Sequence, residues 1–156
     1  MNFKGFLATL SFFMSLSFVA NAAIGDFAGQ WEGRGNYILS GDLTNCGVMS
    51  LTFAANNNQF KFVTGERNCD KHTEKFYPVT LKADGGKLFF NGEIVGSYTE
   101  ETMNLAFRMP EGNGQFRNWR MSMRVSGDHL MYEESRTMDG EKTPLISFAG
   151  LLIRQK

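Results

Sequence analysis

A small group of charged and aromatic residues has the chemistry to bind a ligand. Arginine side chains bind carboxylate or phosphate groups in a fixed geometry, and aromatic and methionine side chains cover the apolar part of a bound molecule. If the segments near residues 119 and 134 are strands, alternate residues share one face of a sheet. Charged, aromatic and methionine residues on one such face predict a site for a small apolar or amphipathic ligand. Its residues are Tyr37, Arg117, Trp119, Met121, Tyr132, Glu134 and Arg136.

The same charged residues also fit a purely structural role. A buried charge without a partner is very costly. Glu134 and Arg136 would then pair with Glu66, with Arg117 or with each other near one end of the fold, where water reaches them. The sequence leaves both roles open.

Sequence motifs of the common catalytic and cofactor sites are absent. The chain lacks the Gly-x-Ser-x-Gly and His-Glu-x-x-His motifs, a phosphate-binding loop, a dinucleotide fingerprint and a spaced Cys/His cluster. Its two histidines, His72 and His129, have no evident catalytic partner at a local spacing. The pattern predicts a protein that is not an enzyme and that holds neither a metal ion nor a cofactor.

The strands that carry these residues follow from the polarity pattern. After Gly29, short segments of alternating polarity are separated by Asn, Asp and Gly clusters, which is typical of an antiparallel meander. We expect strands near residues 30–40, 46–55, 60–68, 73–83, 87–95, 102–109, 116–125, 129–137 and 143–154. The sequence therefore predicts an all-β fold, an eight- to nine-stranded antiparallel up-and-down β-barrel, whose closure removes exposed edges.

The two cysteines and the apolar pattern favour one register for the first hairpin. With Asn57-Asn58 as a two-residue turn, the expected pairs are Phe53–Phe62, Leu51–Thr64 and Met49–Glu66. The same register places Cys46 opposite Cys69, within disulfide distance. Unrelated thiols or half of a metal site are the alternatives, but an even count, together with the export signal expected at residues 1–22, favours a disulfide. By alternation, we expect this disulfide on the outside of the barrel.

Two further turns define a face in the same way. A turn at Gly85-Gly86 predicts an apolar face from the pairs Ala83–Leu88, Leu81–Phe90, Val79–Gly92 and Tyr77–Ile94. A turn at Gly127-Asp128 predicts the pairs Val125–Leu130, Met123–Tyr132, Met121–Glu134 and Trp119–Arg136. The opposite face there carries Asn118, Arg120, Ser122 and Arg124. Such an exterior argues against a membrane-embedded barrel, whose outer face is apolar.

The N-terminal segment predicts export. Lys4 precedes an apolar run that ends at Val19, and Ala20-Asn21-Ala22 forms an A-x-A cleavage site. A membrane anchor is the alternative, but the run is shorter than the ~20 residues of a span. We therefore expect a signal peptide at residues 1–22, cleaved after Ala22, and one domain at residues 23–156 in the periplasm or secreted. The formal net charge of +0 makes nucleic acid a poor partner.

The opening of the predicted domain carries a family resemblance. Gly29-Gln-Trp31 at the start of the first strand of a meander resembles the calycins, which include lipocalins, fatty-acid-binding proteins and avidins. The resemblance implies that Trp31 closes one end of a barrel against a basic residue of the last strand, for which Arg154 is the match. The opening is also similar to that of nitrobindin-like haem proteins, but no histidine follows His129 to ligate iron.

Two functions of different classes fit this domain. The first is an exported lipocalin-like binding protein that holds a small apolar or amphipathic ligand in the barrel. The second is an exported inhibitor of a protease or lysozyme, with a protein partner, which acts through surface loops such as Pro110-Glu-Gly-Asn-Gly114. Bacterial inhibitors of both kinds resemble this chain in using a small disulfide-bearing barrel.

Overall fold

The computed structural model describes residues 24–56, 58–70, 72–112 and 114–156. The predicted signal peptide, residues 1–22, lies outside the described residues. A 3-10 helix, η1 (Ile24–Phe27), precedes eleven strands. The strands are β1 (Gly29–Leu39), β2 (Asp42–Asn56), β3 (Gln59–Cys69), β4 (His72–Phe76), β5 (Val79–Asp84), β6 (Lys87–Phe90), β7 (Glu93–Tyr98), β8 (Thr102–Gly112), β9 (Gln115–Ser126), β10 (His129–Met138) and β11 (Ile146–Arg154).

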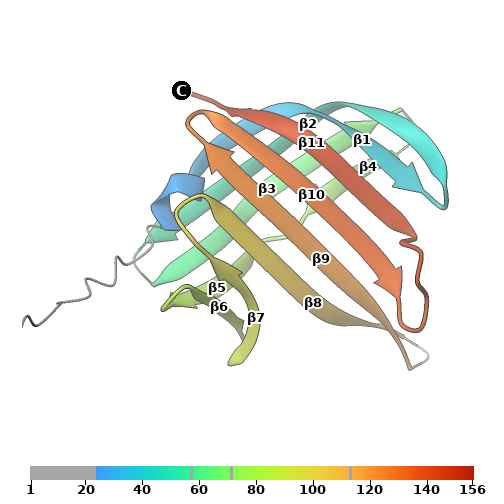
Figure 1. Cartoon of the computed structure of the whole chain (residues 1–156). Helices are drawn as coiled ribbons and strands as arrows, with labels where there is room; N and C mark the ends of the chain where they lie inside the picture. Colours follow the sequence, from blue (N-terminus) through green and yellow to red (C-terminus); the bar gives the residue numbers. More distant parts are fainter. Residues whose placement is uncertain (1–23, 57, 71, 113) are drawn as a thin grey trace, which may run out of the picture.

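The strands form one antiparallel sheet that closes into a barrel (Figure 1). Its order is β2-β1-β11-β10-β9-β8-β7-β6-β5-β3-β4, and the additional pairing of β2 with β3 closes the ring. Ten strands make the wall, while β4 is an extra strand that pairs with β3. The prediction of an all-β, antiparallel, up-and-down barrel is confirmed, and the predicted number of eight to nine strands is wrong. No helix in the described part of the chain has the length and apolar character of a membrane span.

Two predicted strands are each divided in two. The segment near 73–83 forms β4 and β5, because Pro78 has no N–H to donate within a sheet. The segment near 87–95 forms β6 and β7, joined by a tight turn in which Asn91 and Gly92 have φ angles of 52° and 87°. The predicted apolar face fails here, since Tyr77 is 83% exposed and Ile94 is 59% exposed.

Register predictions hold where a hairpin has no bulge. Between β9 and β10, the four predicted pairs from Val125–Leu130 to Trp119–Arg136 are all present. Between β5 and β6, Ala83 lies opposite Leu88 as predicted. The pairing of these strands extends only from Lys82–Phe89 to Asp84–Lys87, so it does not include the predicted pairs Leu81–Phe90, Val79–Gly92 and Tyr77–Ile94. The predicted loop of residues 110–114 is shorter than expected, because β8 continues through Pro110 to Gly112.

The first hairpin contains two bulges that compensate each other. Phe53 pairs with Phe62 and Cys46 pairs with Cys69, as predicted, but the register shifts between Thr52 and Phe53 and shifts back between Cys46 and Val48. Between the two bulges, the predicted partners Thr64 and Glu66 are therefore wrong: Leu51 pairs with Gly65 and Met49 with Arg67. Arg67, rather than Glu66, faces the interior and is fully buried.

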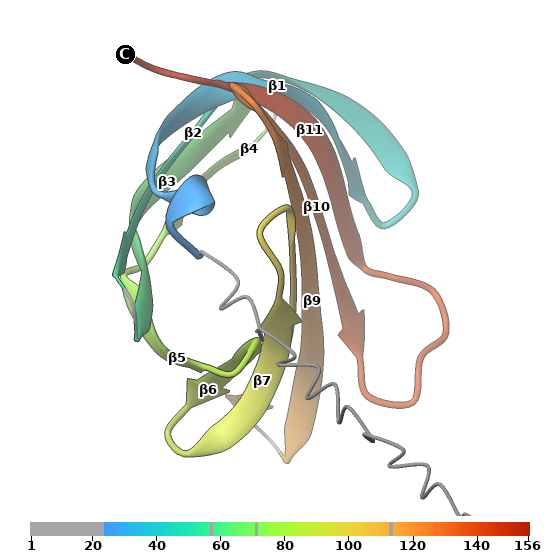
Figure 2. The ribbon, with the colours of Figure 1, turned by 60° about the vertical axis from the view of Figure 1, so that its left-hand side comes forward.

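Aromatic residues and η1 cover one end of the barrel. Figure 2 shows η1 at this end, beside β2 and β3. Trp31 is fully buried and donates from Nε1 to the carbonyl oxygen of Phe27 at 2.9 Å. Arg154 pairs with Trp31 across β1 and β11, and its guanidinium lies 4.2 Å from the centre of the indole ring. Gly29 lies beside them, since a Cβ there would be 3.3 Å from Nη1 of Arg154.

Candidate functional site

The wall of the barrel is interrupted at the end opposite η1. Strand β7 pairs with β8 only over Met103–Leu105. Among the described residues, the rest of β8 is paired with β9 on one side and with no strand on the other. On the other side of the interruption, β4 pairs with β3 through Gly65–Cys69. In the described part of the chain, β4 and the second half of β8 are therefore two unpaired edges. We call this region the lateral mouth.

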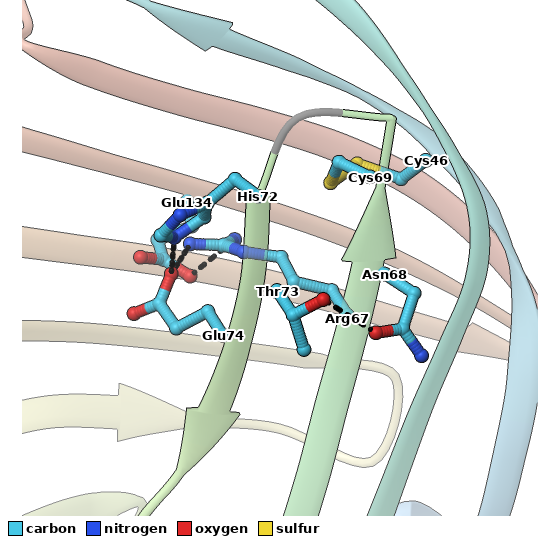
Figure 3. The surroundings of a disulfide bond; sticks show 8 residues. All are labelled: Cys46, Arg67, Asn68, Cys69, His72, Thr73, Glu74 and Glu134. Carbon is cyan, nitrogen blue, oxygen red and sulfur yellow. Dashed lines mark hydrogen bonds and ion pairs between the residues drawn. A yellow bond between two sulfur atoms is a disulfide. The ribbon is translucent and has the colours of Figure 1, made fainter.

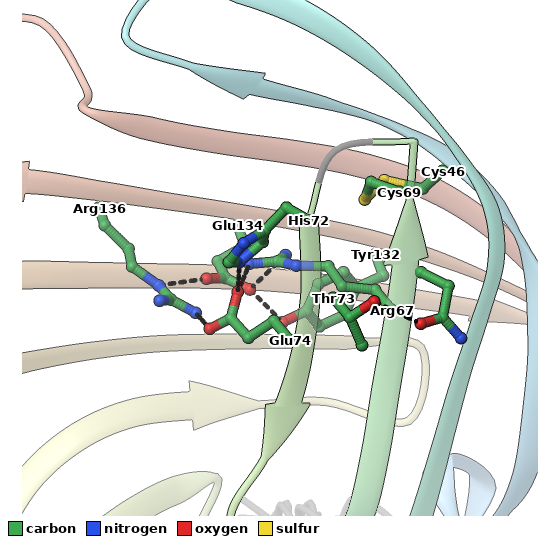
Figure 4. Close-up of polar contacts among 10 residues, drawn as sticks. Cys46, Arg67, Cys69, His72, Thr73, Glu74, Tyr132, Glu134 and Arg136 are labelled. Atoms are coloured by element: carbon green, nitrogen blue, oxygen red, sulfur yellow. Dashed lines mark hydrogen bonds and ion pairs between the residues drawn. A yellow bond between two sulfur atoms is a disulfide. The ribbon is translucent and has the colours of Figure 1, made fainter.

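A cluster of four charged side chains crosses the interior behind the lateral mouth (Figure 4). Nη1 of Arg67 lies 3.2 Å from a carboxylate oxygen of Glu134, and its Nη2 contacts Glu74. Arg136 donates from Nε to Glu134 at 2.6 Å and from Nη2 to Glu74. The hydroxyl of Tyr132 donates to Glu134 at 2.8 Å. Two cations and two anions thus compensate each other, which agrees with the structural role considered for Glu134 and Arg136.

Aromatic rings surround the buried guanidinium of Arg67. Its central carbon lies 4.9 Å from the ring centre of Tyr37, 5.3 Å from that of Phe76 and 5.1 Å from that of Phe148. The electron-rich faces of such rings attract a cation. The site is therefore built to hold a positive charge away from water, with Glu134 and Glu74 as its counter-ions.

Burial and charge shift the pKa values in this cluster in different directions. Burial raises the pKa of Tyr132 well above its usual value, and the negative charge of Glu134 raises it further. Burial also favours the neutral form of Glu74, but the charges of Arg67 and Arg136 outweigh it and lower the pKa of Glu74. Glu74 is thus held as a carboxylate, and Tyr132 keeps its proton as a hydrogen-bond donor.

The disulfide lies beside this cluster and inside the barrel, not on the outside as predicted (Figure 3). Cys46 is 2% exposed and Cys69 is 8% exposed. The two bulges in the first hairpin change the alternation that the prediction assumed, so that Cys69 shares the inner face with Arg67. The bond joins β2 to the end of β3 that leads into β4, the strand that carries Glu74.

Aromatic side chains continue from the charged cluster to the surface. The guanidinium of Arg136 lies 5.1 Å from the ring centre of Trp119. The ring centres of Trp119 and Phe107 lie 5.7 Å apart, and those of Phe107 and Phe90 lie 6.0 Å apart. Phe90 is 38% exposed. These rings form a row from the interior to the lateral mouth.

Besides Nε of Arg67 in the charged cluster, two buried donors next to this row lack a partner among the described residues. They are Nε of Arg117 and Nε1 of Trp119, which lie on the inner face of β9 two residues apart. Nη2 of Arg117 is bound to Glu111 at 2.8 Å, so its Nε remains available. A buried donor without an acceptor costs about 1–3 kcal/mol. A bound acceptor group would remove that cost.

The structure brings together most residues predicted to bind a ligand, but in two groups. Tyr37, Tyr132, Glu134 and Arg136 belong to the charged cluster, while Arg117 and Trp119 lie at the lateral mouth. Met121 is 3% exposed in the core. The residues predicted to close the barrel, Gly29, Trp31 and Arg154, lie at the opposite end and take no part in either group.

Sequence reasoning missed Arg67 and Glu74. The bulge that turns Arg67 inward leaves no mark in the polarity pattern, because Glu66 and Arg67 are both charged. Glu74 was part of a longer predicted strand, and Pro78 was the available signal that this strand ends early.

The lowered pKa of Glu74 predicts the acid stability of the protein. Its pKa lies below the usual 4.5 in the folded protein, so its ion pairs contribute stability above that pH. This contribution is lost as the pH falls through the lower, folded value. In Glu74→Gln, we expect a flatter decline of the free energy of unfolding below about pH 4.5. Urea denaturation between pH 7 and pH 3 measures it; parallel curves for the two proteins would contradict the assignment.

Comparison with known proteins identifies the fold. No protein-family model and no curated protein sequence matches the chain. The crystal structure of Rv2717c from M. tuberculosis matches with a TM-score of 0.55 at 15% identity, over 86% of this chain and 96% of that chain. The S-type phycobiliprotein lyase CPES from Guillardia theta matches with a TM-score of 0.49 at 11% identity, over 84% and 89% of the two chains. At such identities, the similarity to Rv2717c shows a common barrel fold alone.

One sequence prediction is corrected by these matches. The missing motifs predicted that the chain is not an enzyme, but one protein with a matching barrel is named as a lyase. Missing local motifs alone do not exclude catalysis.

Proposed function

We propose that this protein is an exported, calycin-like binding protein for a small amphipathic molecule with an anionic group, bound at the lateral mouth. The observation that carries the proposal is the pair of buried, unpartnered donors, Nε of Arg117 and Nε1 of Trp119. An anionic group with two or more oxygen atoms is the acceptor that a guanidinium binds best.

The charged cluster supports this choice of Arg117 over the other arginines. Arg67 and Arg136 already bind Glu134 and Glu74, so the two cations and two anions leave no excess positive charge. Nε of Arg67 has no partner within the described part of the chain, but the Arg67 side chain is fully buried, whereas a ligand must reach its site from the solvent. A ligand anion placed there would compete with carboxylates that are covalently held in position. Arg117 is accessible at the mouth, with 23% of its side chain exposed.

The aromatic row supports an apolar, preferably planar, ligand body. Phe90, Phe107 and Trp119 present ring faces and edges in series. Stacked or edge-to-face ring pairs add about 0.5–1.5 kcal/mol beyond their buried area. A planar ligand at the mouth would extend this series toward the solvent.

Two features support export. The N-terminal segment has the pattern of a signal peptide, and the Cys46–Cys69 disulfide is typical of proteins outside the reducing cytosol. The Gly29-x-Trp31 opening packed on Arg154 supports a relationship to calycins, because the same closure is expected there.

A pair of fluorescent probes tests the proposal. 1-Anilinonaphthalene-8-sulfonate carries an anionic group on an aromatic body, and N-phenyl-1-naphthylamine has the same ring system without the sulfonate. We expect one binding site per chain and a Kd for the sulfonate about tenfold lower, since one charge-assisted hydrogen bond is worth about 1.5–3 kcal/mol. Arg117→Gln should reduce this preference to about twofold or less. Trp119→Phe should weaken the binding of the sulfonate probe and leave the binding of the neutral probe unchanged.

Arg124→Gln is the matched control. Arg124 lies on the same strand as Arg117 but is exposed on the outer face. The variant should bind both probes as the wild type does. Equal Kd values for the two probes in the wild type would contradict the anionic group, and no binding of either probe would contradict the site.

A further inference from the structure

A groove of about 1070 Å³ lies on the outer face of the barrel, and it is also bordered by Glu134 and Phe148, whose side chains are buried on the inner face of the same wall. Besides two charged residues, its floor has small side chains that point outward from β8, β9, β10 and β11, namely Ala106, Ser122, Ser135, Ser147 and Ala149. Ile38 and Leu43 of the β1–β2 hairpin line one end, and Ile94 and Val95 of β7 line the other. The groove therefore crosses seven adjacent strands, from β2 to β7.

The twist of the sheet explains why an outer face is hollow here. A twisted sheet is saddle-shaped, so that two diagonally opposite corners curve toward the same side. The β1–β2 hairpin and β7 occupy two such corners of the sheet from β2 to β7. Small floor residues deepen the groove between them.

The dimensions of the groove fit an extended polypeptide. Neighbouring strands lie about 4.8 Å apart, so six spacings span about 29 Å, the length of eight or nine extended residues. The backbone of the floor strands is already paired within the sheet, so a bound chain would be held by its side chains. Exposed aliphatic residues at the two ends, such as Leu43 at 67% and Ile94 at 59% exposure, supply apolar anchor points.

The charges of the groove select among ligands of this length. Arg120 and Glu133 lie on neighbouring strands of the floor, and neither has an ion-pair partner within the described residues. Lys87 lies at the β7 end. A groove with both signs of charge complements a polypeptide with an acidic and a basic side chain, and it complements a polyanion or an anionic lipid poorly.

We propose that this groove binds an extended segment of a partner protein, with aliphatic residues toward its ends and an acidic and a basic residue near its centre. The groove is a second site, separate from the ligand site at the lateral mouth. It gives the protein a docking surface formed by a sheet face rather than by loops.

Selection of peptides tests this inference. A phage library of random dodecapeptides is selected on the purified full chain, and the enriched peptides are measured by fluorescence anisotropy. We expect enriched peptides to contain an acidic and a basic residue between aliphatic residues. Ala149→Trp, which fills the floor at an exposed position, and Arg120→Glu should each raise their Kd about tenfold or more, as expected for a lost charge-assisted contact.

Arg124→Glu is the matched control, because Arg124 is exposed on the same face of β9 but does not line the groove. It should leave the Kd unchanged. The proposal is overturned if no peptide is enriched, or if enriched peptides bind Ala149→Trp and Arg120→Glu as tightly as the wild type. Sedimentation equilibrium adds one more outcome: a wild-type dimer that Ala149→Trp dissociates would assign the groove to a second copy of this chain and overturn the partner segment.

Discussion

Replacing Arg67 with methionine is expected to lower the free energy of unfolding by about 3–5 kcal/mol, the usual cost of removing one partner from a buried ion pair. Arg67 is fully buried and contacts both Glu134 and Glu74. Methionine has a similar volume, so the loss reports charge rather than a cavity. The remaining cluster would hold two carboxylates against the single cation Arg136, and one of these carboxylates, Glu134, is fully buried.

Urea denaturation of three variants separates this effect from a general packing defect. Arg67→Met alone should be the least stable. Adding Glu134→Gln removes the excess negative charge and should restore a large part of the loss, since neutral replacements of whole pairs are often tolerated. Arg124→Met, an exposed control, should change stability by less than about 0.5 kcal/mol. A loss below about 1 kcal/mol for Arg67→Met would contradict a buried, compensated cluster.

Removing the disulfide is expected to cost about 3 kcal/mol. The cysteines are separated by 23 positions, and a loop of this length restricts the unfolded chain by about that amount. The double variant Cys46→Ala/Cys69→Ala should also loosen β4, because the bond secures the end of β3 that leads into it.

Reduction provides the matched comparison for this variant. Wild type in dithiothreitol should lose about the same stability as the double variant, while the double variant should not respond to the reductant. Hydrogen exchange at Thr73–Phe76 should be faster in both reduced wild type and variant. Equal stability of oxidised and reduced wild type would show that the bond adds nothing to the fold.

Strand alternation predicted the candidate site well where the sheet is regular. The hairpin of β9 and β10 has a two-residue turn and no bulge, so one turn placement assigned Trp119, Tyr132, Glu134 and Arg136 to the inner face. Their burial and contacts follow from that register. The sequence therefore predicted four of the residues that form the charged cluster and the lateral mouth.

Bulges explain what alternation could not predict. A single extra residue reverses which side chains face inward, and two bulges in the first hairpin place Arg67 and the disulfide inside. The cysteine pairing survived because the second shift cancels the first. Strict alternation without a bulge also predicted Glu66 inside the barrel. In the structure, Glu66 instead accepts a hydrogen bond from Asn68 at the surface.

The predicted number of strands was too low because two local signals that end a strand were overlooked. Pro78 ends a strand, and Asn91-Gly92 is a dipeptide with a strong preference for tight hairpin turns. The outer groove was beyond prediction, because its shape depends on how far two corners of the sheet curve. That curvature is a property of the whole barrel rather than of any segment.

The ratio of the Kd values of the two naphthalene probes tests the central claim most directly. If the protein binds an amphipathic anion at the lateral mouth, the sulfonate-bearing probe should bind about tenfold more tightly than its neutral counterpart. The same ratio should fall to about two or less in Arg117→Gln. A ratio that is the same in wild type and Arg117→Gln would contradict the proposed site.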